Sequence, residues 1–227
     1  MIKRALEAGL IEMAVTNPRD FTKSRHRQVD DTIYGGGAGM LMMCQPLFDA
    51  CHHVLPEKGP RDRVIFLSPA GKTFTQDRAK ELQRDYDHLV LICGHYEGVD
   101  HRVEEHLADE LISIGDYVLT GGELGAMVIS DAVARMVPGV LGDAGSAASD
   151  SFYEPILEYP QYTKPADYNG WKVPDVLLSG HHANIARWRR KEALRRTMTC
   201  RPDLLEGQEL SKEDRKLMEE IREEKEE

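Results

Sequence analysis

The sequence predicts an α/β fold built around a parallel sheet. Three apolar runs support this prediction: VIFL (64–67), LVLIC (89–93) and ELISI (110–114). Each contains consecutive apolar residues, and helix-forming segments or glycine-containing loops separate them. Strands of this kind are buried on both faces, which is typical of a parallel sheet covered by helices.

Capping residues and apolar spacing predict the helices between these strands. Residues 73–87 are rich in helix formers and open with a capping box of Thr73 and Gln76. The run YVL (117–119) either continues the third strand or forms a short strand of its own. A further helix follows the glycines of TGG (120–122) and ends near residue 136, with apolar positions at Leu124, Met127, Val128 and Ala132.

A change of composition marks a domain boundary in the second half of the chain. Residues 138–151, PGVLGDAGSAASDS, have the small and polar composition of a linker. Turns rich in Pro and Tyr follow, and then a basic helix over residues 183–199 with Ile185, Trp188 and Leu194 on its apolar side. A last helix starts at Ser211, where Asp214 completes a capping box.

The chain is acidic overall but contains one strongly basic segment. The 227 residues carry a net charge of −10, and the segment 203–227, with eleven acids and five bases, supplies −6 of it. Residues 187–201 instead contain seven bases and one acid. This pattern by itself favours a solvated helix face, and a nucleic-acid surface is the alternative.

Composition also excludes several classes of protein. Hydrophobic residues make up 41% and charged residues 30%, which is typical of a globular chain. No apolar run approaches the length of a membrane helix, and residues 1–15 lack the apolar core of a signal peptide. The four cysteines form no C-x-x-C pair, so we expect reduced thiols and a cytoplasmic protein.

Three glycine-containing loops predict a small-molecule pocket. SPAG (68–71), CGHYEG (93–98) and TGG (120–122) each follow one of the predicted strands. Open α/β sheets bind ligands where parallel strands end, and glycine lets the backbone approach a ligand. Neither a P-loop nor a dinucleotide fingerprint is present, so these patterns leave the ligand open.

Other polar residues admit more than one interpretation. The run Gly35–Gly39 is either a flexible loop on the substrate side, beside the donors of residues 25–28, or a wide turn. Asp150 is either a turn or N-cap residue or a catalytic residue, and Glu97 is either a ligand contact or solvated. The adjacent histidines 52–53 and 181–182 are not at metal-ligand spacing, so no metal site is predicted.

Ten segments in order resemble the bacterial tRNA (guanine-N1)-methyltransferase family of the TrmD type. The likeness covers nearly the whole chain, and the order and spacing of the segments make it specific. They are NPRDF (17–21), HRQVDD with YGGGAGM (26–40), LSPAGK (67–72), CGHYEGVDHRV (93–103), IGDYVLTGGEL (114–124), DAVARMVPGVLG (131–142), SDSF (149–152), PQYTKP (160–165), VPDVLLSGHHANIARWRR (173–190) and RPDLLEG (201–207).

The resemblance implies a fold that the patterns alone do not predict. Family members have a SPOUT-type α/β domain with a deep trefoil knot and a small C-terminal helical domain. Knots are exceptions to the rule that connections are unthreaded. By this resemblance, residues 1–141 are the knotted S-adenosylmethionine-binding domain, 142–151 a flexible linker and 152–227 a helical tRNA-binding domain.

The resemblance also implies the reaction. Family members are homodimers with the active site at the subunit interface. They transfer a methyl group from S-adenosylmethionine to N1 of the guanosine immediately 3′ of the anticodon (position 37), when another guanosine precedes it. This modification supports reading-frame maintenance. Two other functions stay open: a knotted methyltransferase acting on another RNA position, and a non-enzymatic RNA-binding protein.

Individual residues acquire roles through the same resemblance. Asp150 matches the family's general base, and Arg135 matches the arginine that supports guanine O6. Family members also use magnesium for transfer, and the resemblance leaves open whether the ion contacts Glu97 or the substrate. The residues that match methyl-donor contacts are Leu67, Ser68, Pro69, Gly94, Tyr96, Glu97, Ile114, Gly115, Asp116, Tyr117, Val118, Leu119, Gly121 and Gly122. Those that match tRNA-binding segments are His26, Arg27, Asp30, Arg187, Arg189, Arg190 and Arg195.

The chain departs from the family pattern at two places. Gly125 stands where a proline is common after TGGEL, which should loosen the start of that helix. The family normally has another strand before the residues that match Ile2, and a missing strand would leave a gap in a buried sheet.

Overall fold

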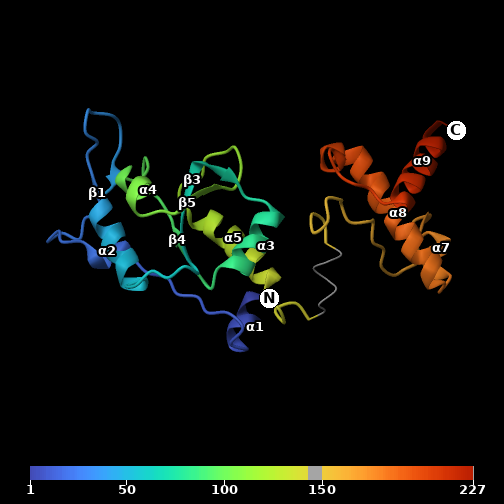
Figure 1. Ribbon diagram of the computed structural model, residues 1–227, viewed down its shortest axis with the longest axis horizontal. Helices are drawn as coiled ribbons and strands as arrows, with labels where there is room; N and C mark the ends of the chain where they lie inside the picture. Colours follow the sequence, from blue (N-terminus) through green and yellow to red (C-terminus); the bar gives the residue numbers. More distant parts are fainter. Residues whose placement is uncertain (143–149, 227) are drawn as a thin grey trace. The chain divides into compact units, whose positions relative to one another are not determined.

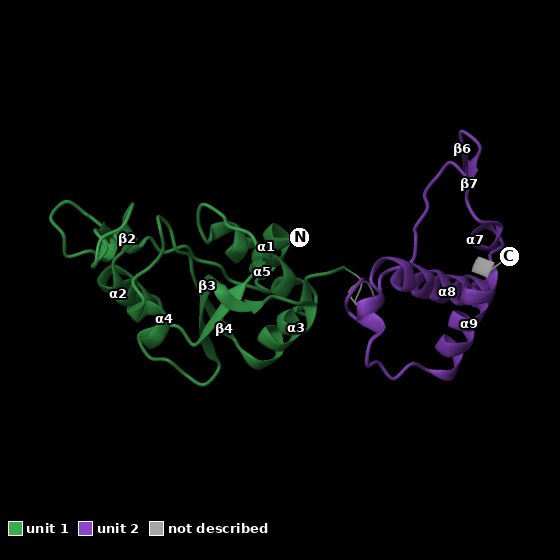
Figure 2. Ribbon diagram, turned by 90° about the horizontal axis from the view of Figure 1, so that it is seen from above, with its two compact units in different colours: residues 1–142 green, residues 143–227 purple. Residues whose placement is uncertain are grey.

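The computed structural model describes residues 1–142 and 150–226 (Figure 1). The chain divides into two compact units, Met1–Gly142 and Asp143–Glu227 (Figure 2). Most of the predicted linker, residues 143–149, lies outside the described part.

Unit 1 is a mixed α/β structure, as predicted. Its elements are helix α1 (Ile2–Glu7), the 3-10 helix η1 (Pro18–Phe21), strands β1 (Asp30–Asp31) and β2 (Leu41–Met42), helix α2 (Cys44–Val54), strand β3 (Asp62–Thr73), helix α3 (Gln76–Asp85), strand β4 (His88–Ile92), helix α4 (Arg102–His106), strand β5 (Glu110–Ser113) and helix α5 (Glu123–Met136).

The sheet has the order β4-β3-β5, and both pairs are parallel. Alternate residues of β3 face opposite sides. Val64 and Phe66 pack with Leu47 of α2 and Val103 of α4 on one face. Ile65 packs with Leu82 of α3 and Ile129 of α5 on the other. Helices thus cover both faces, which explains why VIFL is apolar at every position.

The first predicted loop lies inside a strand. β3 continues to Thr73, and its pairing with β5 shifts register between Leu67 and Lys72, so that both residues pair with Ile112. Residues 68–71 form the bulge between these two pairings. A Cβ on Gly71 would lie 2.4 Å from the Ile112 amide nitrogen, so glycine is what allows the two strands to approach here.

Two further predictions about local structure were wrong in detail. Helix α3 is capped by Thr75, whose side chain accepts from the Arg78 amide at 3.3 Å, and not by Thr73. The reason is that the strand extends to Thr73 and Phe74 still donates to the Ser113 carbonyl. Residues 117–119 form no strand, because Tyr117 turns back to donate to the carbonyls of Gly115 and Ile114.

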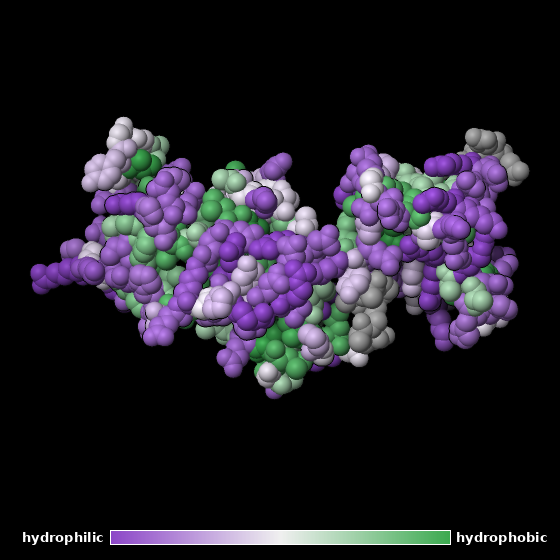
Figure 3. Space-filling view, in the orientation of Figure 1, coloured by the Kyte–Doolittle hydropathy of each residue, from purple (hydrophilic) through white to green (hydrophobic). Residues whose placement is uncertain are grey.

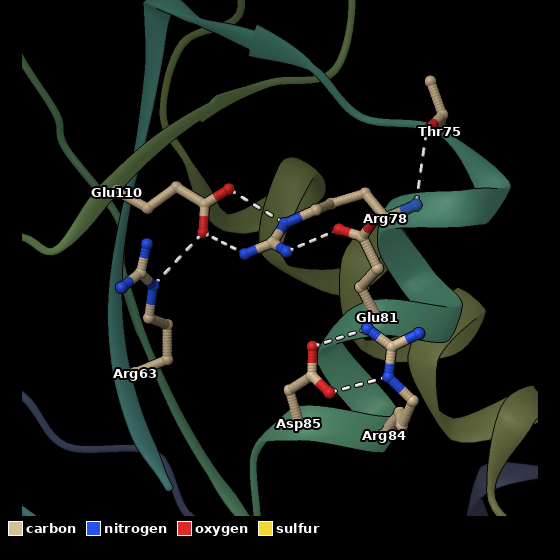
Figure 4. A network of polar contacts seen from close by, with 7 residues as sticks. All are labelled: Arg63, Thr75, Arg78, Glu81, Arg84, Asp85 and Glu110. Carbon is tan, nitrogen blue, oxygen red and sulfur yellow. Dashed lines mark hydrogen bonds and ion pairs between the residues drawn. The ribbon is translucent and has the colours of Figure 1, made fainter. Parts of the chain in front are cut away.

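An ion-pair network fixes α3 to the sheet (Figure 4). Glu110 of β5 accepts from Arg63 of β3 at 3.3 Å and from Arg78 of α3 at 2.9 Å. The Glu110 side chain is only 17% exposed, so it depends on both arginines for compensation of its charge. Arg78 also binds Glu81 one turn along the helix.

Unit 2 is mainly helical. It contains strands β6 (Asp167–Tyr168) and β7 (Trp171–Lys172), helices α7 (Asp175–Leu178), α8 (His182–Cys200) and α9 (Lys212–Glu226), and the 3-10 helix η2 (Pro202–Leu205). Leu194 of α8 packs against Leu217, Met218 and Ile221 of α9. The predicted capping box at Ser211 is confirmed, since Ser211 Oγ accepts from the Asp214 amide at 3.0 Å and donates to its carboxylate.

Within the described residues, no helix combines the length and apolarity needed to cross a bilayer.

Candidate active site

Two of the predicted glycine loops meet at the carboxyl edge of the sheet. The loop after β4 and the loop before α5 are joined by a hydrogen bond from the Gly122 amide to the Gly94 carbonyl, 2.9 Å long. A Cβ on Gly122 would lie 2.7 Å from Cys93 Cα. The two backbones therefore touch, which only glycine at position 122 permits.

Two neighbouring glycines are also closely packed, against side chains that line the same corner. A Cβ on Gly121 would lie 2.6 Å from His95 Nε2, and one on Gly94 would lie 2.9 Å from Val99 Cγ2. His95 Nε2 is 2.8 Å from Glu123 Oε1, so the first residue of α5 also contacts the β4 loop. The result is a corner of closely packed, partly exposed backbone, and backbone of this kind can approach and hydrogen bond a polar ligand.

The loop after β5 folds over its own backbone. Gly115 has φ +144°, and a Cβ there would lie 2.5 Å from the ring of Tyr117. Ser113 Oγ accepts from the Gly115 amide at 3.2 Å. Of the other predicted donor contacts, Ser68 is buried in the β3 bulge and accepts from the Ala70 amide, whereas Val118 is exposed.

The predicted substrate segment contacts the β4 loop through the chain around Met42. The Met42 amide donates to the Gly98 carbonyl at 2.9 Å, and the Glu97 amide donates to the Met40 carbonyl at 3.1 Å. A Cβ on Gly39 would lie 2.4 Å from Glu97 Cγ, while Gly35 and Gly36 face open space. The glycine-rich run is therefore open at its start and closely packed at its end.

Arg19, for which the sequence suggested no role, links the same two segments. Its guanidinium donates to the Arg27 carbonyl at 2.7 Å and to Tyr96 Oη at 3.4 Å. Arg27 and Tyr96 both have positive φ, at 57° and 60°. The only sequence signal was the presence of Arg19 in the motif NPRDF, because no local pattern relates residue 19 to residue 96.

The nearby thiol does not have the properties of a nucleophile. Burial, together with the charge of Glu123, raises the pKa of Cys93 to about 11. A thiol with this pKa is protonated at neutral pH. Covalent catalysis by Cys93 is therefore disfavoured, although the residue lies beside the glycine corner.

The two predicted catalytic side chains lie in different units. Arg135 is partly buried in the last turn of α5, in unit 1. Asp150 is the first described residue of unit 2 and lines a cavity of about 350 Å³. Glu154, Glu158, Tyr159, Arg189 and Arg190 contribute the polar part of the wall of that cavity.

The arginines of α8 fall into two groups. Arg187 and Arg195 bind carboxylates of α9, and Arg190 binds Asp214 of α9 and Glu154. In the part of the chain that the structure describes, no carboxylate lies within ion-pair distance of Arg189, whose guanidinium lies 5.0 Å from the centre of the Tyr159 ring. Charge counting along the sequence could not separate the two groups.

Apolar side chains are exposed at several places on unit 1. Val118 is 90% and Met127 66% exposed, and Leu124 of α5 is also exposed. Apolar surface also reaches the exterior around α1 (Figure 3), where Leu6 and Leu10 are exposed. Where such side chains gather into one patch, they are typical of a contact with another protein surface.

Comparisons with known proteins identify the chain. The sequence model of "tRNA (Guanine-1)-methyltransferase TrmD" matches residues 1–207. A tRNA (guanine-N(1)-)-methyltransferase of Halalkalibacterium halodurans is 54% identical over 226 residues, covering 100% of this chain and 92% of the relative. Enzymes of the same name from Bacillus cereus (strain AH820) and Bacillus anthracis (strain CDC 684) are 54% identical over 223 residues, covering 98% of this chain and 91% of each relative.

These matches define the class of protein as an RNA-modifying methyltransferase. The chain belongs to the TrmD family of tRNA (guanine-1)-methyltransferases.

Proposed function

We propose that this protein transfers a methyl group from S-adenosylmethionine to N1 of the guanosine 3′ of the anticodon, position 37 of tRNA. Membership of the family supports the reaction. The observation that carries the site is the glycine corner, where Gly122 meets Cys93 and Gly94 with no room for a side chain.

The donor would be held by the backbone at this corner. S-adenosylmethionine, when bound, supplies an electrophilic sulfonium methyl group. The peptide groups of Gly94 and Gly121, with Tyr96 and the bulge residues Leu67 to Pro69, are the contacts we propose. The loop from Ile114 to Leu119 and Gly122 complete them. The close crossing of the β4 loop and the start of α5 is compatible with a trefoil knot in residues 1–141.

The protein's own chemistry is directed at the guanine base. N1 of guanine carries a proton, and its removal moves negative charge onto O6. Asp150 is the proposed acceptor of this proton, and the Arg135 guanidinium is the proposed partner of O6. The cavity that Asp150 lines supports this assignment, because it offers space for a bound group beside the carboxylate.

We assign tRNA contacts to both units. In unit 1 they are His26, Arg27 and Asp30, in the segment joined to the β4 loop through Met42. In unit 2 they are Arg187, Arg189, Arg190 and Arg195. Because no described carboxylate lies within ion-pair distance of Arg189, its guanidinium is the most available of these to a phosphate. The exposed apolar residues of α5 and the 117–119 loop favour a homodimer with an active site at its interface.

The protein offers few ligands for a magnesium ion. Glu97 offers one carboxylate, and within the described residues no group of three His, Cys, Asp or Glu side chains is arranged to hold a metal ion. This set fits only an ion that keeps most of its water or uses oxygens of the substrate.

Methyl transfer to two tRNA transcripts tests the function. We expect incorporation into a transcript with guanosine at position 37 and none when adenosine replaces it. Equal transfer to both would mean that another position is methylated. Failure to bind S-adenosylhomocysteine in a calorimetric titration would favour a non-enzymatic RNA-binding protein.

Substitution of Asp150 tests the mechanism. Asp150→Ala should lower the transfer rate by at least about 100-fold, the usual contribution of a general base, with unchanged affinity for S-adenosylhomocysteine. Asp150→Glu, which keeps the carboxylate, should retain part of the activity. Loss of donor binding in Asp150→Ala would contradict the assigned role.

A further inference from the structure

The facing sides of α8 and α9 form a ladder of alternating charges. Arg187, Lys191 and Arg195 lie at four-residue intervals on α8, and Glu220 and Glu224 lie at the same interval on α9. Glu220 binds Arg187 at 2.6 Å and Lys191 at 3.1 Å. Glu224 binds Lys191 at 2.7 Å and also Arg195. Every cation of this charge ladder therefore has a carboxylate partner.

Hydrophobic packing keeps the two carboxylates in place. Leu217 and Ile221 of α9 are at most 1% exposed against Leu194 of α8. They occupy the face of α9 that lies between the helices, and Glu220 and Glu224 lie beside it. The charge ladder is thus fixed by an apolar contact that persists when salt weakens the ion pairs.

The charge ladder lowers the positive charge that this surface presents to a polyanion. Glu220 and Glu224 reduce the charge of the three cations from +3 to +1, and Glu192 of α8 also binds Arg195 at 3.1 Å. The Lys191 side chain is only 13% exposed and binds both carboxylates, which therefore compete directly with a phosphate oxygen for its ammonium group. Non-specific RNA binding depends on the number of cations that contact phosphates.

We propose that Glu220 and Glu224 are specificity-determining residues, which compete with RNA phosphates for three cations of α8 and so weaken the binding of RNA that lacks the shape of the cognate tRNA. The proposal rests on the proposed role of unit 2 in tRNA binding. A tRNA compensates by contacts elsewhere in the site, whereas an unstructured RNA has only phosphate contacts to offer.

A pair of matched double variants separates this effect from net charge. Glu220→Gln/Glu224→Gln removes both carboxylates of the charge ladder. Glu219→Gln/Glu223→Gln changes the net charge by the same amount on the same helix. Both residues are exposed, and neither forms an ion pair with a cation whose side chain is described. Binding of an oligouridine of about 20 nucleotides and of the cognate tRNA transcript is measured by anisotropy over a range of KCl concentrations.

The charge-ladder variant should bind oligouridine about tenfold more tightly than the matched control at low salt. Its plot of log affinity against log salt should be steeper by about 1.4, because each of the two fully released cations, Arg187 and Lys191, adds about 0.7 for a single strand. Arg195 keeps Glu192 as a partner in this variant. The affinity for tRNA should rise less, so the preference for tRNA over oligouridine falls. Equal behaviour of the two double variants, or an unchanged preference, would overturn the proposal.

Two controls keep the result interpretable. If the double variant does not fold, as judged by circular dichroism, Glu220→Gln is compared with Glu219→Gln, and the same differences are expected at smaller size. Arg189→Ala tests the underlying function. If the wild-type protein does not bind tRNA, or if Arg189→Ala binds tRNA as tightly as wild type does, the proposed role of unit 2 in tRNA binding is contradicted. If tRNA binding depends on Arg189 but the charge-ladder variant behaves like its control, only the present inference fails.

Discussion

Gly122 offers a direct test of the glycine corner, through the substitution Gly122→Ala. Its φ of −78° and ψ of −9° are ordinary for alanine, so the backbone itself creates no strain. The obstacle is steric, because the new Cβ would lie 2.7 Å from Cys93 Cα and 3.2 Å from the Gly94 amide nitrogen. These are backbone atoms and cannot rotate away, so the two loops must separate.

The size of the effect follows from two contributions. Overpacking against a fixed neighbour costs about 1–3 kcal/mol. Lengthening the 2.9 Å hydrogen bond from Gly122 to Gly94 removes up to about 1 kcal/mol more. We therefore expect the free energy of unfolding to fall by about 3 kcal/mol, which lowers the melting midpoint of a unit of this size by roughly 6–12 °C.

Urea unfolding and calorimetric titration with S-adenosylhomocysteine measure the two consequences. The matched control is Gly142→Ala, where an added Cβ meets nothing within 4 Å. We expect the control to behave like wild type, and Gly122→Ala to lose both stability and ligand affinity. If the two variants agree within about 0.5 kcal/mol and bind the ligand equally, a closely packed donor corner is refuted.

Two further predictions concern the ion pairs. Glu110→Gln leaves Arg63 and Arg78 without their shared carboxylate, and it should lower the free energy of unfolding by about 2 kcal/mol in urea titrations; a change under about 0.5 kcal/mol would mean that the network is not stabilising. Hydrogen bonds from Lys191 and Arg195 lower the pKa of Glu224 from 4.5 to about 2. Because the pKa is lowered on folding, this stabilisation is complete above pH 4.5 and is lost as the pH falls towards 2. The melting midpoint should therefore fall over this range, and less so in Glu224→Gln; identical pH profiles would contradict the assignment.

The arrangement of the site explains why residues distant in sequence should act together. The segment proposed to contact tRNA is hydrogen bonded to the β4 loop at Met40 and Met42, and Arg19 adds a contact to Tyr96. A change in the β4 loop, which we propose contacts the donor, can therefore alter the position of Arg27 without any direct contact between donor and tRNA. No single loop motif contains both parts of this connection.

The sequence was most informative where a residue's environment is set by its neighbours in the chain. Consecutive apolar residues in VIFL predicted a strand buried on both faces, and Ser211 with Asp214 predicted the start of α9. It was least informative where strands continue past their apolar core. The strand β3 runs through Ser68–Gly71 because β5 pairs with it again after a bulge, and pairing between distant strands leaves no local signal.

By itself, the sequence determined the α/β class and two of the three glycine loops, and its ordered motifs identified the family. These depend on local propensity, apolar spacing and composition, which act over a few residues. Only the tertiary structure decided which loops touch, that Arg19 contacts Tyr96, and that α9 pairs with most of the basic face of α8. Those features depend on distances between segments far apart in the chain, and such distances are fixed only when the apolar faces pack.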